Sequence, residues 1–390
     1  MNLYVVSCCR TAIGSFGGSL KGVSAPELGA IAAAEAMKRA KIEPKEIDEL
    51  IFGCILSAGL GMNVARQVSV KAGIPVERTA ATVNMVCGSG MKSVVDGARA
   101  ILAGDADIIL AGGTENMSQA PYLFPAGRWG ARMSDSAMID SMVRDGLWDV
   151  YGDYHMGITA EHIAERWQIT REQQDLFALA SQTKALKAKS EGKFIREIVA
   201  VPIREKRETM NFCEDEYPRV TSMEALSKLR PAFKPDGTVT AGNASGINDG
   251  AAALVLASED AVKRHGLRPM ARLAGWGQAG VDPAVMGIGP VEAVKKAMQK
   301  AGVSIGQLDL IESNEAFAVQ SIAVARDLGL DQDKVNVNGG AIALGHPIGA
   351  SGARIIVSLL HEMEQRTVKY GLATLCIGGG MGIATIFEKC

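Results

Sequence analysis

Two stretches of this chain decide its fold because they are copies of one pattern. Residues 36–48 read AMKRAKIEPKEID, and residues 297–309, offset by 261 positions, read AMQKAGVSIGQLD. Each reads as a helix end and a turn that lead into an apolar strand, Leu50–Ile55 in the first copy and Leu308–Ser313 in the second. The long offset predicts two similar α/β halves rather than a solenoid of short repeats.

Around each copy, short apolar runs alternate with helical patterns, as is typical of sheets flanked by helices. The other expected strands are the N-terminal residues 1–6, Ala80–Val86, Asp107–Gly112, Ala251–Ala257, Val335–Asn338, Leu372–Ile377 and Ile383–Phe387. The expected helices cover residues 91–102, stopped by Gly104, and residues 159–167, 171–189 and 355–363. Residues 161–220 are charged at 22 of 60 positions, which indicates an insertion lying over the core.

The composition excludes several classes of protein. A chain of 390 residues with 47% hydrophobic and 22% charged residues is globular and long enough for two or three domains. The net charge of -2 provides no general attraction to nucleic acid or to an anionic membrane, and no apolar run is long enough to span one. The seven cysteines are scattered and form no Cys-x-x-Cys pair, which argues against a disulfide framework and favours a reducing cytoplasm. The five histidines lack metal-ligand spacing, which argues against a zinc site.

Cys87 is the clearest chemical signal. It stands in NMVCGSG, residues 84–90, where a predicted strand turns into an amphipathic helix and glycines allow a tight turn and access by a ligand. The positive end of a helix favours a thiolate, but by at most about 2 kcal/mol, or ~1.5 pKa units, so a base partner is expected. The alternative is a small buried thiol that packs as a hydrophobe.

His346 is the candidate base. It lies in GGAIALGHPIG, residues 339–349, between an expected strand and an expected helix, and Pro347 biases its backbone toward an extended conformation. A neutral imidazole can take a thiol proton and return it later. The alternative is a structural histidine.

Two further polar groups follow expected strands. Cys376 precedes GGGMG, residues 378–382, whose successive N–H groups can form an anion site, although a buried structural thiol is the alternative. Asn314 begins NEAF, where it either acts in a site or caps the next helix. Because open α/β sheets bind ligands at the carboxyl ends of their strands, we expect Cys87, His346, Cys376 and Asn314 to share one site.

Competing motifs are weaker. Gly275–Gly280, GWGQAG, matches a dinucleotide fingerprint and raises an NAD-dependent oxidoreductase as an alternative. Val281–Pro283 follows where the phosphate-binding helix should open, so we interpret the run as a glycine-rich strand exit. Gly349–Ala353, GASGA, narrowly misses the hydrolase elbow Gly-x-Ser-x-Gly.

With these motifs in order, the whole chain resembles the thiolase family. The matching segments are Arg10–Gly14 (the family's first loop), Asn84–Met91 (nucleophile), Asn314–Phe317 (asparagine motif), Gly339–Ala353 (histidine motif) and Cys376–Gly382 (second cysteine). Ketoacyl synthases share the fold but lack the paired cysteines. The resemblance implies a duplicated α/β fold with mixed sheets in five α/β/α/β/α layers. The expected divisions are 1–118 plus 249–268 for the N-terminal domain, 119–248 for an inserted loop domain that binds substrate and CoA, and 269–390 for the C-terminal domain.

The resemblance also implies a reaction, the joining of two acetyl-CoA molecules into acetoacetyl-CoA, with no cofactor and no metal. Cys87, deprotonated by His346, would carry the acetyl group, and Cys376 would take a proton from the second acetyl-CoA. His346 and a water held by Asn314 would stabilise the enolate, while the N–H groups of Cys87 and Gly378 would hold the other oxyanion. A dimer or tetramer is expected, and the alternatives are a broader 3-ketoacyl-CoA thiolase of fatty-acid degradation and a non-catalytic acyl-CoA-binding protein.

The substrate range is inferred from the insertion. Tyr154–Gly157, YHMG, resembles the segment of short-chain biosynthetic thiolases in which the methionine narrows the acyl pocket, although Met156 can also be plain core packing. The CoA contacts implied by the resemblance are Leu147, His155, Ala244, Ser245, Ala316 and Phe317, with Arg219 toward the nucleotide phosphate. One further hypothesis is that mild oxidation joins Cys87 to Cys376, provided that their Cα atoms come within about 7 Å.

Overall fold

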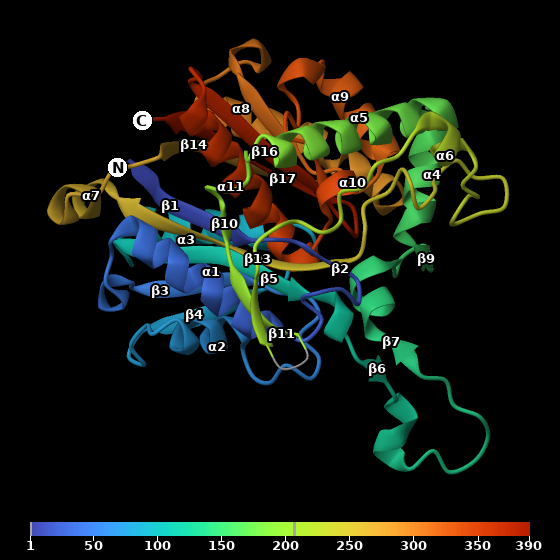
Figure 1. The fold of residues 1–390 in the computed structure, drawn as a ribbon, viewed down its shortest axis with the longest axis horizontal. Coiled ribbons are helices and arrows are strands. Elements are labelled where there is room, and N and C mark those ends of the chain that lie inside the picture. The colour runs from blue at the N-terminus through green and yellow to red at the C-terminus, as the bar shows by residue number, and fades with distance from the viewer. Residues whose placement is uncertain (1, 206–207) are drawn as a thin grey trace.

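The duplicated pattern folds as two copies of one strand order. The computed structural model describes residues 2–205 and 208–390, and Figure 1 shows its elements. The first half has the order β1 (Leu3–Thr11), β13 (Asn248–Ser258), β5 (Ile108–Asn116), β3 (Glu49–Gly53) and β4 (Thr79–Val83). The second half has β14 (Ala271–Gly280), β17 (Met381–Lys389), β16 (Tyr370–Ile377) and β15 (Leu310–Ser313). The prediction of two similar α/β halves is therefore confirmed.

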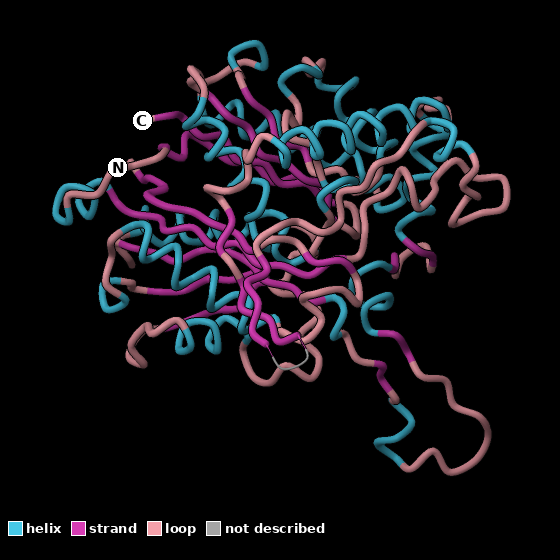
Figure 2. The backbone as a smooth tube through the Cα atoms, in the orientation of Figure 1, coloured by secondary structure: helices cyan, strands magenta, loops and turns pink. Residues whose placement is uncertain are grey.

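The two halves meet edge to edge at β1 and β14. These strands pair antiparallel through Tyr4 with Arg272 and Val5 with Ala271, so the strands form one continuous mixed sheet. Figure 2 shows the strands crossing the middle of the molecule with helices around them. The resemblance implied stacked sheets, and here the short junction lets the halves fold over one another while remaining hydrogen-bonded.

Helices cover both outer faces and fill the space between the halves. The outer helices are α1 (Ala25–Ala40) and α2 (Val64–Lys71) on the first half, and α8 (Gly289–Ala301) with α9 (Ala318–Leu328) on the second. Between the halves lie α3 (Ser89–Ala103) and α11 (Ile348–Gln365). Helix α3 contacts β5 and β17, and α11 contacts β13 and β16, so each inner helix touches both halves. The five α/β/α/β/α layers are as predicted.

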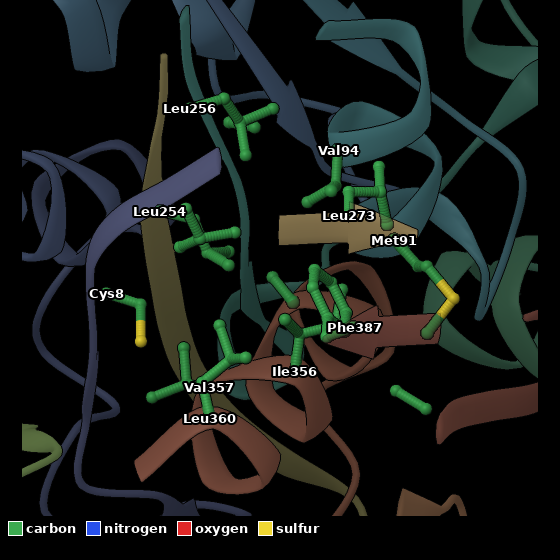
Figure 3. Close-up of a cluster of buried hydrophobic side chains, with 14 of the residues drawn as sticks. Cys8, Met91, Val94, Leu254, Leu256, Leu273, Ile356, Val357, Leu360 and Phe387 are labelled. Carbon is green, nitrogen blue, oxygen red and sulfur yellow. The ribbon is translucent and has the colours of Figure 1, made fainter. Parts of the chain in front are cut away.

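The largest apolar core surrounds the two inner helices. Figure 3 shows Val94 of α3 and Ile356 of α11 among side chains from strands of both halves, including Leu254 of β13 and Phe387 of β17. All four are fully buried. Burial of one such side chain stabilises the fold by roughly 1.5–3 kcal/mol, so this cluster fixes the inner helices and the residues at their first turns.

The inserted segment, expected over residues 119–248, forms short strands and turns with two longer helices beside the core. Its elements are β6 (Tyr122–Leu123), β7 (Ile139–Asp140), the π-helical turn η4 (Met142–Leu147), β8 (Trp148–Asp149), β9 (Tyr154–His155), α4 (Met156–Arg166), α5 (Arg171–Ser190), β10 (Ile198–Val199), β11 (Val201–Glu205), β12 (Glu208–Phe212) and α6 (Met223–Ser227). Short elements elsewhere are β2 (Gly14–Ser15), α7 (Glu259–His265) and α10 (Ala341–Leu344), with 3₁₀ turns at η1 (Pro44–Glu46), η2 (Met117–Gln119), η3 (Pro125–Trp129), η5 (Pro283–Ile288), η6 (Ile305–Gln307) and η7 (Gln332–Lys334). The chain leaves the first half after β5 and rejoins it at β13, while the domain boundaries stay predictions.

The expected strand Val335–Asn338 is wrong. This segment makes a single bridge to Ile311, at Val335, where the first half has the full strand β4. Asn336 has a φ of 44°, which an extended strand does not allow. Its side-chain amide exchanges hydrogen bonds of 2.9 and 2.8 Å with the backbone of Ser313, and these replace the missing ladder.

Two local interpretations also change. The glycine run Gly275–Gly280, interpreted as a strand exit, forms the end of β14 itself. A Cβ on Gly275 would lie 2.7 Å from the backbone oxygen of Ala297, so these glycines let α8 lie directly on the strand. Helix α4 begins at Met156, earlier than residue 159, because the His155 side chain caps it by accepting from the Gly157 N–H.

Candidate active site

A cavity of about 510 Å³ opens between the two halves and the inserted segment. The predicted residues that line it are Cys87, Leu147, His155, Met156, Ala244, Ser245, Ala316, Phe317, His346 and Gly378. Cys376, Asn314 and Arg219 do not line it. Strand ends of both halves therefore converge here, although His346 follows the short helix α10 rather than the expected strand.

Cys87 stands on a strained turn between β4 and α3. Val86, directly before it, has a φ of 45°, which is a genuine outlier for a β-branched residue. Side chains on both sides hold this turn: Asn84 accepts from the Val86 N–H at 3.0 Å, and Ser89 accepts from the Met85 N–H at 2.8 Å. Such strain persists only where the surroundings determine the conformation, and here it presents the sulfur to the cavity.

Gly90, the second glycine after Cys87, allows two helices to pack closely. A Cβ on Gly90 would lie 2.7 Å from the backbone nitrogen of Ala353 in α11. Reciprocally, a Cβ on Gly352 would clash with the backbone nitrogen of Met91 in α3. The first turns of α3 and α11 therefore lie against each other, and the positive ends of both helices face the same site.

The thiol of Cys87 needs help to ionise. Burial raises its pKa to about 11, although hydrogen bonds from the N–H groups of Gly378 and of Cys87 itself act in the opposite direction. The helix start therefore does not by itself provide a thiolate at neutral pH. The expectation that Cys87 requires a base partner follows from these contacts as well as from the sequence.

His346 has the properties of such a base. Burial, with the nearby positive charge of Arg354, lowers the pKa of its imidazole to about 3, so the ring is neutral. Its Nε2 has no hydrogen-bond partner within residues 2–205 and 208–390, while its Nδ1 lies 2.6 Å from the Ser351 hydroxyl. Asn248 holds the backbone, because its side chain accepts from the His346 N–H at 3.0 Å and donates to Gly14.

Cys376 and Asn314 are buried outside the lining, and Cys376 packs in one apolar cluster with Met156 and Phe317, which do line the cavity. Cys376 is fully buried near the end of β16, and burial, with the nearby Cys87 as the second cause, raises the pKa of its thiol. Both thiols are free, and the disulfide stays a hypothesis. Asn314 follows β15 but does not cap α9, whose N-cap is Phe317. Neither polar atom of its buried amide is paired with any described residue, so it is available to a small polar ligand.

Comparisons with known proteins decide the family. The sequence model described as thiolase, N-terminal domain, matches residues 3–260, and the one described as thiolase, C-terminal domain, matches residues 267–389. The chain belongs to the thiolase family.

Relatives of this thiolase are similar over their whole length. It is 58% identical to a protein named acetyl-CoA acetyltransferase from Syntrophomonas wolfei, with 98% of each chain covered. It is 56% identical to one of the same name from Escherichia coli, with 100% of this chain and 99% of the other covered.

Solved structures give the same result. The Bacillus anthracis acetyl-CoA acetyltransferase superposes with a TM-score of 0.98 at 45% identity, covering 100% of this chain and 99% of that one. Human mitochondrial 3-ketoacyl-CoA thiolase, which has also been solved in complex with CoA, superposes at 0.96 and 46% identity, covering 100% and 98%. The thiolase fold, and the assignment as an enzyme of this kind, are therefore confirmed.

The insertion of this thiolase provides one wall of the cavity. His155 stacks on Phe233 with ring centroids 4.7 Å apart, and Phe233 meets Phe317 edge to face at 6.3 Å. Met156 approaches the β16–β17 turn, because a Cβ on Gly378 would lie 3.4 Å from its sulfur. This places a bulky side chain next to the N–H group that faces Cys87.

Four of the predicted CoA contacts share one stretch of the cavity wall, and Arg219 lies apart from them. Ala244 and Phe317 form an antiparallel bridge, and the Ser245 N–H donates to the Ala316 carbonyl at 2.9 Å, so these four residues form one continuous stretch of wall. Arg219 is exposed and stays outside the lining. Its guanidinium lies 5.0 Å from the ring centroid of Tyr217, which does line the cavity, so Arg219 stands at the rim.

The sequence interpretation missed several lining residues. These are mainly Phe16, Met117, Tyr217, Phe233, Thr240, Ile247, Met286 and Ile348. Most come from irregular segments, where no periodicity points to a cavity. The available signals were positional, because Phe16 lies beside the first-loop motif and Ile348 lies within the histidine motif.

The described part of the chain has neither a metal-binding cluster nor a membrane-spanning helix. No cluster of three or more histidine, cysteine, aspartate or glutamate side chains suited to a metal ion occurs among them. No helix in the same ranges is long and apolar enough to cross a lipid bilayer.

Proposed function

We propose that this thiolase joins two acetyl-CoA molecules reversibly into acetoacetyl-CoA and CoA through an acetyl group carried on Cys87. One observation carries the proposal: Cys87 shares a cavity with Gly378 and with His346, whose Nε2 is unpaired by any described residue. A nucleophile, a base and a donor for an oxyanion are thus combined in one place. The relatives named acetyl-CoA acetyltransferase support the choice of substrate.

The first half-reaction transfers an acetyl group. His346 takes the proton of Cys87, and the thiolate attacks the thioester carbonyl of acetyl-CoA. The carbon–sulfur bond to CoA then breaks, and CoA leaves with a proton returned by His346. The N–H groups of Cys87 and Gly378 stabilise the oxyanion, and loss of one such donor typically raises the barrier by about 3 kcal/mol.

The second half-reaction forms the carbon–carbon bond. The Cys376 thiol passes its proton to His346 and, as the thiolate, removes a proton from the methyl carbon of a second acetyl-CoA. The resulting carbanion attacks the acetyl carbon on Cys87, and the Cys87 thiolate leaves and takes the proton back from His346, so that all three groups return to their starting state. A thiol whose pKa is raised by burial is a strong base once deprotonated, which suits a weakly acidic C–H group. The amide of Asn314, through a water, and the proton that Nε2 of His346 holds at this stage stabilise the enolate oxygen.

Met156 favours short acyl chains. Its side chain is buried against the Gly378 turn and the cavity, so it occupies space that a longer acyl chain would need. Similarity to human mitochondrial 3-ketoacyl-CoA thiolase favours a second candidate, cleavage of longer 3-ketoacyl-CoA substrates. Comparing cleavage of four-carbon and longer substrates separates the two. High activity of the wild-type enzyme on long chains would support the second candidate.

The pantetheine arm of CoA fits the apolar wall of the cavity. Leu147, His155, Ala244, Ser245, Ala316 and Phe317 provide this wall, and Arg219 at the rim is suited to a nucleotide phosphate. Thiol, imidazole, amide and backbone N–H groups supply every role in the reaction, so no resident cofactor or metal is required. Two catalytic thiols must stay reduced, which favours the cytoplasm.

A homo-oligomer, a dimer or a tetramer, is the proposed assembly. Strand β4 is the terminal strand of the sheet and presents an unpaired edge. The hairpin of β6 and β7 projects from the body, as Figure 1 shows, and carries the exposed side chains of Phe124, Trp129, Met133 and Met138. Exposed apolar groups of this size on a projection favour a protein contact. Light scattering of the wild type and of Trp129→Ser tests whether the hairpin holds the assembly together.

Intact mass measured after exposure to acetyl-CoA tests the reaction. Wild-type protein should gain one acetyl group, and Cys87→Ala should gain none. Cys376→Ala should gain the acetyl group but form no acetoacetyl-CoA. Labelling of Cys87→Ala, or condensation by Cys376→Ala, would contradict the assigned roles.

A further inference from the structure

Ser351 lies at the end of the first turn of α11, beside the candidate base. Its hydroxyl oxygen is 2.6 Å from Nδ1 of His346 and 2.9 Å from the carbonyl oxygen of Pro347. Both Ser351 and His346 are buried, so water does not compete for these contacts. The sequence interpretation noted this serine only as part of a near miss for a hydrolase motif.

The two contacts together fix the direction of the hydrogen bonds. A carbonyl oxygen only accepts, so the single hydroxyl proton of Ser351 points to Pro347. The serine oxygen then accepts, and Nδ1 of His346 must be the protonated ring nitrogen. The opposite assignment would leave two acceptor oxygens facing each other at 2.9 Å.

The other ring nitrogen is consequently free of a proton. Nε2 of His346 is buried and makes no hydrogen bond to any part of the chain that the structure describes, and the residue lines the cavity with Cys87. We infer that Ser351 is a positioning residue that holds His346 in the tautomer with its proton on Nδ1, so that the lone pair of Nε2 faces the reacting thiol. This inference rests on the proposed role of His346 as base, but the tautomer itself does not depend on any substrate.

The electrostatic surroundings agree with this assignment. The charged group that acts on His346 is Arg354, one turn further along α11, which disfavours a second proton on the ring. Arg354 itself lies 3.5 Å from Glu312 of β15, so its charge is partly compensated. The ring is therefore a neutral imidazole with its proton on one nitrogen. The Ser351 hydroxyl is the one hydrogen-bond partner of this ring among the described residues, so it determines which nitrogen carries the proton.

Nitrogen-15 NMR of histidine-labelled protein measures the tautomer directly. The His346 signals are assigned by comparison with His346→Gln. We expect a protonated Nδ1 and a bare Nε2 in the wild type, and a mixture that includes the Nε2–H form in Ser351→Ala. Finding the Nε2–H form in the wild type would overturn the inference. This measurement uses the wild type, so it stands even if the alanine variant folds poorly.

Kinetics provide the second readout. Ser351→Ala should lower kcat by about 10- to 100-fold with little change in KM, the size typical of losing a group that orients a reacting side chain. The rate of Cys87 alkylation by iodoacetamide at pH 7 should fall with it. Ser358→Ala is the matched control, because Ser358 is a buried serine on the same helix that contacts Glu197 and lies outside the cavity.

The outcomes separate this inference from the proposed function. If wild-type protein is not acetylated by acetyl-CoA, the proposed function fails, while the NMR measurement still decides the tautomer. If Ser351→Ala and Ser358→Ala have equal kcat and equal alkylation rates, Ser351 has only a structural role and the inference is wrong.

Discussion

The first turns of α3 and α11 are built alike but carry different chemistry. In α3, Ser89 accepts from the Met85 N–H and donates to the Val86 carbonyl at 2.8 and 2.7 Å. In α11, Ser351 makes the corresponding pair of contacts with the ring of His346 and the carbonyl of Pro347. One serine thus holds the backbone that carries a nucleophile, and the other holds the side chain of a base. The two halves therefore share a serine in the first turn of the inner helix, but the group that this serine stabilises differs between them.

A glycine follows each serine and strengthens the comparison. Gly90 and Gly352 each allow the other helix to approach within backbone contact, so the two serines lie in symmetrical positions. The difference between the halves is therefore local, in the residues before each helix rather than in the packing behind it. The following substitutions test whether the two halves differ in chemistry and share only their packing.

The largest effect is expected at His346. Replacing it with alanine should lower kcat by about 1,000-fold, because the variant loses the group that moves the Cys87 proton. The control is His361→Ala, a buried histidine of α11, the helix that follows His346. Its Nε2 faces the Cys8 carbonyl, and its kcat should change by no more than about threefold. Equal losses in steady-state assays of both variants would mean that His346 contributes packing and no chemistry.

The pH dependence of the wild type should separate His346 from an ordinary histidine. Because its pKa is lowered from 6.5 to about 3, the imidazole stays neutral as the pH falls from 7 to 5. The base is lost only when the pH approaches the lowered value. We therefore expect kcat/KM to show no ionisation near 6.5 on its acid side, and such an ionisation, if abolished in His346→Ala, would contradict the burial argument.

Asn314 and Cys54 compare the two halves at another pair of strand ends. Each is the first residue after its strand, β15 or β3. Asn314→Ala should lower kcat by about 100- to 1,000-fold, the range for losing an oxyanion donor. Cys54 contacts the buried Glu115 at 3.6 Å and lies outside the cavity, so Cys54→Ala should keep kcat within about threefold. A larger loss in Cys54→Ala than in Asn314→Ala would break the distinction between the halves.

Stability tests the packing that the halves share. Gly352→Ala places a methyl group against the backbone of Met91, so the free energy of unfolding should fall by about 2–3 kcal/mol. Gly306→Ala is the control, because its Cβ would meet no atom within 4 Å, and it should change stability by less than about 0.5 kcal/mol. Urea denaturation measures both, and equal values would show that the inner helices can separate at little cost.

The smallest effect is expected at Ser89. Its replacement by alanine removes the acceptor for the Met85 N–H and should slow acetylation of Cys87 by about tenfold, as expected for a cost of 1–2 kcal/mol. The control is Ser93→Ala. Ser93 is a buried serine of the same helix whose hydroxyl contacts the Gly90 and Gly112 carbonyls, so its loss should destabilise the protein about as much as Ser89→Ala does. A stopped assay of acetyl transfer should nevertheless find the Ser93→Ala rate near that of the wild type.

Much of the fold followed from the sequence, because the repeated helix–turn–strand pattern is a local signal that survives in both halves. Cys87, Cys376 and Asn314 lie at strand ends for the same reason. The prediction failed where a side chain replaces the backbone pattern. The Asn336 side-chain amide forms the hydrogen bonds with the Ser313 backbone at the edge of β15 that a neighbouring strand would otherwise form. The pattern of apolar residues in the sequence does not indicate such a contact.

The cavity wall was harder to predict than the chemistry. Phe233 and Met286 come from irregular segments, and their positions depend on tertiary contacts such as the stacking of Phe233 on His155. The role of Ser351 was also hidden, because two hydrogen bonds with opposite directions are visible only in three dimensions.

The contact between Gly90 and Gly352 has a consequence for engineering. It fixes the reacting groups on a rigid block, whereas Met156 and Phe233, which set the size of the pocket, belong to the inserted segment. Selectivity and turnover are therefore carried by separate parts of the chain. Libraries confined to that segment can be screened for bulkier acyl groups while the proton-transfer geometry stays as it is.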